Sequence, residues 1–280
     1  EQKCMLCAQL LAELLSFASL PNLRYFQRVI FCANDAMEQT VNDVISEQKN
    51  IPGSYVAGLT AASATAVPLE LDDGLCCSII LSQREVESLE PEHYHPGNLV
   101  SSLLEELLHI RIYSTAWEKR GYVQPPLSLL PYTRDLLITC GTLHDEYMVA
   151  RWKTAIMGNT ALIDVEGGFS TAYPAYGNQV APMLEQAALS LEYAIRGYFT
   201  PSGKTQLLRV VYREIFEPLA RNAGFQAGTP PAELQYENNP AESAFFQEHV
   251  VAFWNQIKEQ LERSFESSLA EMDGALDEIV

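Results

Sequence analysis

The stretch that decides the fold is Leu103–Ile110, LLEELLHI, which sets Glu105, Glu106 and His109 inside a run of leucine and isoleucine. On a helix that turns by about 100° per residue, these three polar side chains fall within about 100° of one another. The remaining positions predict a helix that is buried on nearly all sides and carries one compact polar notch. Ionised carboxylates in such surroundings cost several kcal/mol each unless something compensates their charge. A divalent metal ion and an arginine are the two candidate compensators.

A second cluster of the same kind follows on the next predicted helix. Residues 142–153, TLHDEYMVARWK, place His144, Asp145 and Glu146 in an otherwise apolar helical run. Two successive helices that each carry a His and Glu cluster near the middle suggest that the clusters face each other. The alternative is a hydrogen-bonded network of Glu and His that only supports the fold, and the residues alone leave both interpretations open.

Hydrophobic periodicity and turn signals extend the prediction along the chain. Between residues 54 and 82, β-branched and small residues interrupted by Asp72-Asp73-Gly74 predict two strands joined by a hairpin-like turn. Residues 159–180 are rich in Gly and Tyr and read as irregular, so we expect two regions, 1–158 and 159–280, the second of them mainly helical. Helices are predicted at 4–17, 34–48, 98–120, 132–157, 180–199, 203–223 and 241–273.

Composition narrows the class of protein. The 280 residues include 18 basic and 36 acidic side chains, which gives a formal net charge of -18. This charge argues against nucleic acid and anionic membrane surfaces as partners, because both would repel the protein. No apolar run reaches the roughly 18 residues of a membrane span. The six cysteines are few for this length, and two of them, Cys76 and Cys77, are adjacent. We therefore expect reduced thiols and a cytoplasmic location.

The order of elements and motifs resembles a known family. Two strands, a helix with E-E-x-x-H at residues 105–109 and a helix with E-Y-x-x-x-R at 146–151 look like the minimal zincin fold of HExxH metallopeptidases, in particular its gluzincin branch. The resemblance covers about residues 30–157 and implies an α+β fold with helices packed on a small sheet. It also implies that residues 76–83, CCSIILSQ, form an edge strand that pairs with an extended peptide.

The resemblance also assigns roles to individual residues. It implies that His109 and Glu146 are metal ligands and that Glu106 is the general base that activates the attacking water. Glu105 stands at the first ligand position, where the family has histidine. If Glu105 binds through an oxygen atom, the ligand set is two carboxylates and one imidazole, which shifts the preference of the site from zinc toward iron or manganese. If no metal binds, the chain is a catalytically inactive zincin-like scaffold that acts as a binding or regulatory module.

Further residues are weaker candidates for the same site. His144 is a possible ligand, but on a regular helix it lies about 200° from Glu146. Tyr113, Tyr147 and Arg151 are candidate hydrogen-bond donors to a developing oxyanion. We expect a metal-dependent, metallopeptidase-like hydrolase whose partner is a peptide or protein, with the inactive scaffold as the alternative.

A ferritin-like di-iron protein is a third possibility, because Glu106-Leu-Leu-His109 is also the E-x-x-H motif of that class. Such proteins need a second E-x-x-H on another helix. The other match in this chain, Glu90–His93, contains Pro91, which argues against a helix. The two predicted strands also do not belong in a four-helix bundle.

Overall fold

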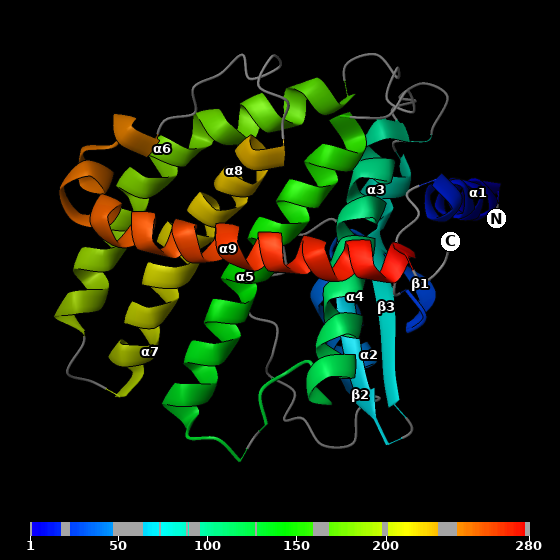
Figure 1. Ribbon diagram of the computed structural model, residues 1–280, viewed down its shortest axis with the longest axis horizontal. Coiled ribbons are helices and arrows are strands. Elements are labelled where there is room, and N and C mark those ends of the chain that lie inside the picture. The colour runs from blue at the N-terminus through cyan, green and yellow to red at the C-terminus, as the bar shows by residue number, and fades with distance from the viewer. Residues whose placement is uncertain are drawn as a thin grey trace. The chain divides into compact units, whose positions relative to one another are not determined.

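The computed structural model describes residues 2–17, 23–46, 64–72, 74–87, 89, 96–126, 128–158, 168–197, 201–228 and 240–277. Over these residues the fold is α+β, with one small sheet and a helical C-terminal part, as the sequence predicts (Figure 1). The described residues form two compact units. The first extends to Arg134, and the second holds Asp135–Gly158 together with the residues from Ser170 onward. A domain boundary after residue 158 stays a prediction.

The sheet of the first unit has the strand order β1-β3-β2. Its central strand, β3 (Gly74–Ser82), runs parallel to β1 (Phe26–Cys32) and antiparallel to β2 (Ala64–Leu71). The predicted edge strand at residues 76–83 is therefore wrong, because both sides of β3 are occupied by other strands. An extended peptide would have to pair with β1 or β2. The strand β1 itself was not predicted.

Helices cover both faces of this sheet. The helix α2 (Met37–Ser46) lies on one face, and α4 (Pro96–Arg120) packs against β2 and β3, so that in Figure 1 these strands lie between the two helices. Successive side chains of a strand point to opposite faces, and those of β3 are almost all buried. Burial on both faces explains its continuous apolar sequence. The core on the α2 side consists of Met37, Val41, Val44, Ile45, Val67, Leu69, Cys76 and Ile80.

The C-terminal end of α4 is fixed to the sheet. The helix ends at Arg120. The next residue, Gly121, has a φ of 74°, which favours glycine, and its N–H donates to the carbonyl oxygen of Trp117 at 2.8 Å. In the segment that follows, the backbone N–H groups of Val123 and Gln124 donate to the Glu70 carboxylate of β2 at 2.6 and 2.8 Å. These bonds fix the segment that follows α4 to the strand β2. The helix α1 (Gln2–Phe17) and the short helix α3 (Gln83–Glu87) also contact α4.

The second unit is helical over its described residues. It contains most of α5 (Pro131–Gly158) and of α6 (Gly168–Arg196), and then α7 (Pro201–Arg209), α8 (Glu217–Gly228) and α9 (Val251–Asp277). A π-helical segment, η4 (Val210–Phe216), joins α7 to α8, and a second one, η7 (Phe246–Val250), follows the short 3-10 helix η6 (Pro240–Glu242) and leads into α9. The helix α6 begins at Gly168, inside the stretch that was expected to be irregular. The sequence did not predict either π-helical segment. Among the described helices, none has the length and apolar character that crossing a membrane requires.

The helix α8 lies unusually close to α5. A β-carbon on Gly224 would lie 2.4 Å from the carbonyl oxygen of Tyr147, and one on Gly228 would lie 2.4 Å from the carbonyl oxygen of Arg151. Real β-carbons do not approach backbone atoms this closely, so only glycine permits the contact. Ala220, one turn before Gly224, is fully buried on the same side of α8. Small residues at every fourth position therefore allow the two backbones to touch.

Because of this contact, we expect Gly224→Ala to destabilise the protein. The added methyl group must push α8 away from α5, which should lower the free energy of unfolding by about 1–3 kcal/mol. The matched control is Gly141→Ala on α5, where an added β-carbon meets nothing within 4 Å. There the change should raise stability by up to about 1 kcal/mol, because alanine favours helix. Urea titration followed by circular dichroism measures both, and equal effects of the two changes would contradict the close packing.

Candidate metal centre

The α4 side of the site has the arrangement that the sequence predicts. Glu105 and His109 lie one helical turn apart and are half-buried, while Glu106 between them is only 8% exposed. The flanking Leu103 and Leu107 are fully buried. The notch is therefore a compact polar feature on a helix that is otherwise in the core.

Tyr113 of α4 lies beside this notch, whereas Arg111 lies on roughly the opposite side of the helix. The rings of His109 and Tyr113 stack with their centroids 6.1 Å apart and an interplanar angle of 26°, which restricts the orientation of the imidazole. Arg111 is 6% exposed, and burial lowers its pKa to about 10. That value is still far above neutral pH, so Arg111 remains a cation within α4.

On α5, Glu146 is held by an arginine that sequence reasoning missed. Nε of Arg221, on α8, donates to Oε2 of Glu146 at 2.8 Å, and the two side chains are 32% and 14% exposed. The close contact of α8 with α5 at Gly224 brings Arg221, one turn earlier, beside Glu146. No local signal pointed to Arg221, because it lies 75 residues further along the chain.

His144 lies elsewhere, as the helix geometry predicts. Its Nδ1 lies 3.2 Å from Oδ1 of Asp145, and its Nε2 lies 2.9 Å from Oγ of Ser264 on α9. Serine, histidine and aspartate in this order also occur in hydrolases, where backbone N–H groups stabilise the oxyanion. Here Ser264 lies within α9, so its own N–H is used by the helix. The contact therefore ties α5 to α9.

Of the three candidate oxyanion donors, two are engaged within the second unit. Tyr147 is fully buried, which raises its pKa, and its hydroxyl accepts a hydrogen bond from Nη1 of Arg151 at 2.7 Å. The Arg151 guanidinium also lies 3.7 Å from the ring centroid of Phe265, a cation–π contact. The Tyr147 hydroxyl is thus inaccessible to a substrate. Tyr113, which is partly exposed beside His109, is the better candidate donor.

The three predicted metal ligands form a group that can hold a metal ion. Glu105, His109 and Glu146 each offer one ligand atom, and these atoms lie within 4.8 Å of one another. Metal–nitrogen and metal–oxygen bonds of about 2.0–2.2 Å place two ligands of one ion at most about 4.4 Å apart. In the tetrahedral geometry usual for zinc, two ligand atoms lie about 3.3–3.6 Å apart, so a pair 4.8 Å apart would have to close by about 1.2–1.5 Å. The donor set fits a divalent cation.

Comparison of the chain with protein-family models, with curated proteins and with solved structures finds no match. The function is therefore inferred from the residues and their chemistry. The second E-x-x-H match, Glu90–His93, lies outside the residues that the structure describes. The five described cysteines, Cys7, Cys32, Cys76, Cys77 and Cys140, are all free thiols.

The bond between Arg221 and Glu146 predicts a stability effect. In chelator-treated protein, Arg221→Met removes the hydrogen-bonded cation from a mostly buried carboxylate and should cost about 1–3 kcal/mol of unfolding free energy. Arg196→Met is the matched control, because it breaks the ion pair of Arg196 with Glu192, whose side chains are 69% and 59% exposed. Exposed pairs contribute little, so we expect a loss below about 0.5 kcal/mol there. Equal losses in urea titrations would show that Arg221 does not compensate Glu146.

Proposed function

We propose that the chain is a metal-dependent hydrolase of the metallopeptidase type, with a peptide or protein as its substrate. The observation that carries the proposal is the group of Glu105, His109 and Glu146, whose ligand atoms lie within 4.8 Å of one another. All three side chains are half-buried, so the donors are partly shielded from water and still accessible to an ion and a small part of a substrate.

Each residue of the group has a distinct role in this proposal. Glu105, His109 and Glu146 would hold the cation, which when bound supplies Lewis-acid polarisation of a carbonyl group. Glu106 would take a proton from the attacking water and hold it on a carboxylate oxygen until the leaving amine accepts it. Its low exposure suits this role, because a shielded carboxylate exchanges few protons with bulk water. Tyr113 would donate a hydrogen bond to the oxyanion.

The ligand set also favours particular metals. Two carboxylates and one imidazole form a harder set than the two histidines and one glutamate of the family that the motif resembles, and harder sets suit iron or manganese as well as zinc. The carboxylates also donate more negative charge, so the cation would be a weaker Lewis acid than in that family. We therefore propose slower turnover than an HExxH site would give.

A second candidate function has its own supporting observation. The hydrogen bond of Arg221 to Glu146 at 2.8 Å already provides the positive charge that a buried carboxylate needs. In this alternative, Glu105, His109 and Glu146 belong to a metal-free network, and the chain is an inactive scaffold that binds a protein or peptide partner. Metal content separates the two functions.

Metal content is the first measurement. Protein purified without chelator or metal-affinity chromatography should carry about one equivalent of zinc, iron or manganese by elemental analysis, and His109→Ala should lose it because one of three ligands is gone. His249→Ala is the matched control, since that histidine is 64% exposed on η7 and should leave the metal content unchanged. Wild-type protein that takes up none of the three metals on reconstitution would reject the hydrolase and support the scaffold.

Turnover tests the role of Glu106. Glu106→Gln should keep the metal and lose at least about 100-fold in kcat against a library of quenched fluorescent peptides, because the amide cannot take a proton. Glu118→Gln is the same change on the same helix, at a carboxylate that pairs with the exposed Arg24 at 3.1 Å, and it should keep kcat within about twofold. Full activity in Glu106→Gln would overturn the assigned role while leaving the metal site intact.

A further inference from the structure

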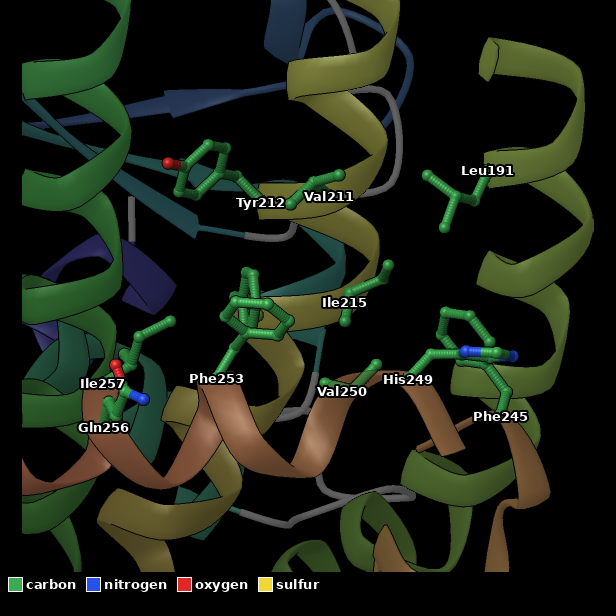
Figure 2. Close-up of a pocket in the computed structure, with 11 residues that line it drawn as sticks. Leu191, Val211, Tyr212, Ile215, Phe245, His249, Val250, Phe253, Gln256 and Ile257 are labelled. Atoms are coloured by element: carbon green, nitrogen blue, oxygen red, sulfur yellow. The ribbon is translucent and has the colours of Figure 1, made fainter. Parts of the chain in front are cut away.

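The second unit contains a pocket that has no part in the proposed metal site. It is lined by residues of α6, η4, η7 and α9 and has a volume of about 440 Å³ (Figure 2). Small-molecule sites in proteins have volumes of about 300–1,000 Å³. Ile215 of η4 and Val250 of η7 are buried in its walls, whereas Phe253 of α9 is 64% exposed at its rim. The pocket is therefore large enough for a small molecule and open to one.

Both π-helical segments of the described chain line this one pocket. Four lining residues, among them Tyr212 and Ile215, come from η4, and His249 and Val250 come from η7. A π-helical turn is rare because it packs less well than the α-helix, and retained π-helical turns occur often at functional sites. The two π-helical segments belong to different helices and line the same cavity. This indicates that their irregular geometry serves to shape the cavity.

The walls are held in place from outside the pocket. The ring of Phe216 stacks on Trp254, which is 5% exposed, with the centroids 6.5 Å apart. Ser243 caps the helix that contains η7, since its Oγ accepts a hydrogen bond from the Phe246 N–H at 3.1 Å. The Ser243 hydroxyl in turn donates to Glu185 of α6 and lowers the pKa of that carboxyl. The pocket is thus preformed, which lowers the entropy cost of binding.

The chemistry of the lining determines the class of ligand. Among the described residues that line the pocket there is no carboxylate, lysine or arginine, and the polar groups are Tyr212, His249 and Gln256. Figure 2 shows His249 beside Phe245 at one end of the pocket and Gln256 beside Ile257 at the other. Just outside, the Glu248 carboxylate lies 3.6 Å from Nε2 of His249. With that carboxylate and a formal net charge of -18, an anionic ligand would be repelled.

We infer that this pocket binds a small uncharged molecule with an apolar body and one hydrogen-bonding group. The apolar body would lie against Ile215, Val250 and Phe253, where burial of apolar surface provides most of the affinity. The hydrogen-bonding group would meet His249 or Gln256 at either end of the cavity. The inference does not depend on metal binding, so binding should be the same with and without chelator.

Titration with Nile red, an uncharged apolar dye, tests the inference on the full chain in the presence of chelator. We expect saturable binding of one dye per chain, displaced by 1-decanol and at least about tenfold less well by decanoate at neutral pH. Phe253→Asp places a carboxylate at the rim and should weaken dye binding at least about tenfold. The matched control is Leu189→Asp on α6, which is 53% exposed and does not line the pocket, and it should change binding less than about twofold.

Three outcomes would overturn the inference. Equal effects of the two aspartate changes would show adsorption to the general surface, and displacement by decanoate as strong as that by 1-decanol would refute the charge argument. A wild-type chain that binds no dye but sediments as a dimer, and becomes monomeric on Phe253→Asp, would show that a second copy covers the pocket. If Phe253→Asp fails to fold by circular dichroism, Val211→Trp, which fills the pocket from η4, replaces it with the same expected loss.

Discussion

The first unit depends on one constraint, which is that α4 must be buried on nearly all sides. Over its central turns, leucine and isoleucine side chains leave little of its surface suited to water. A single sheet surface cannot shield such a helix, and α1, α3, β2 and β3 all contact it. The strand β3 must also be apolar on both sides, since helices cover both of its faces. The polar notch at Glu105, Glu106 and His109 is then the exception in an apolar environment, and it must be explained by function or by compensating charge.

Much of this architecture could be predicted from the sequence, where the signals are local. Helical periodicity located α4 and α5, and the turn residues before Gly74 located the antiparallel pair of β2 and β3. The strand β1 was missed because a parallel strand pairs with a distant segment and needs no turn signal. The apolar run of β3 could have identified it as a central strand. The π-helical segments leave no distinct period in the sequence.

In the candidate site, too, features set by one helix could be predicted and features set by the packing of distant segments could not. Positions within one helix followed from the spacing of Glu105 and His109, and the position of His144 away from Glu146 followed in the same way. Arg221 could not be found, because its approach to Glu146 depends on how α8 packs against α5. The proposed functions differ on what compensates these carboxylates. A divalent metal ion and an arginine both provide positive charge, but only the metal acts as a Lewis acid on a carbonyl group. The need for positive charge at the site therefore does not by itself decide between the two functions.

The glycine contact between α5 and α8 has a mechanical consequence. Packed helices often slide past each other by small shear movements when a protein changes conformation. Here the backbones touch at Gly224 and Gly228, so a shift along the helix axis would bring larger neighbouring side chains against the carbonyl groups of α5. The helices α5 and α8 must therefore move together as one rigid body. Any rotation of α5 that displaces Glu146 also displaces Arg221, so the ion pair between them stays intact during the movement.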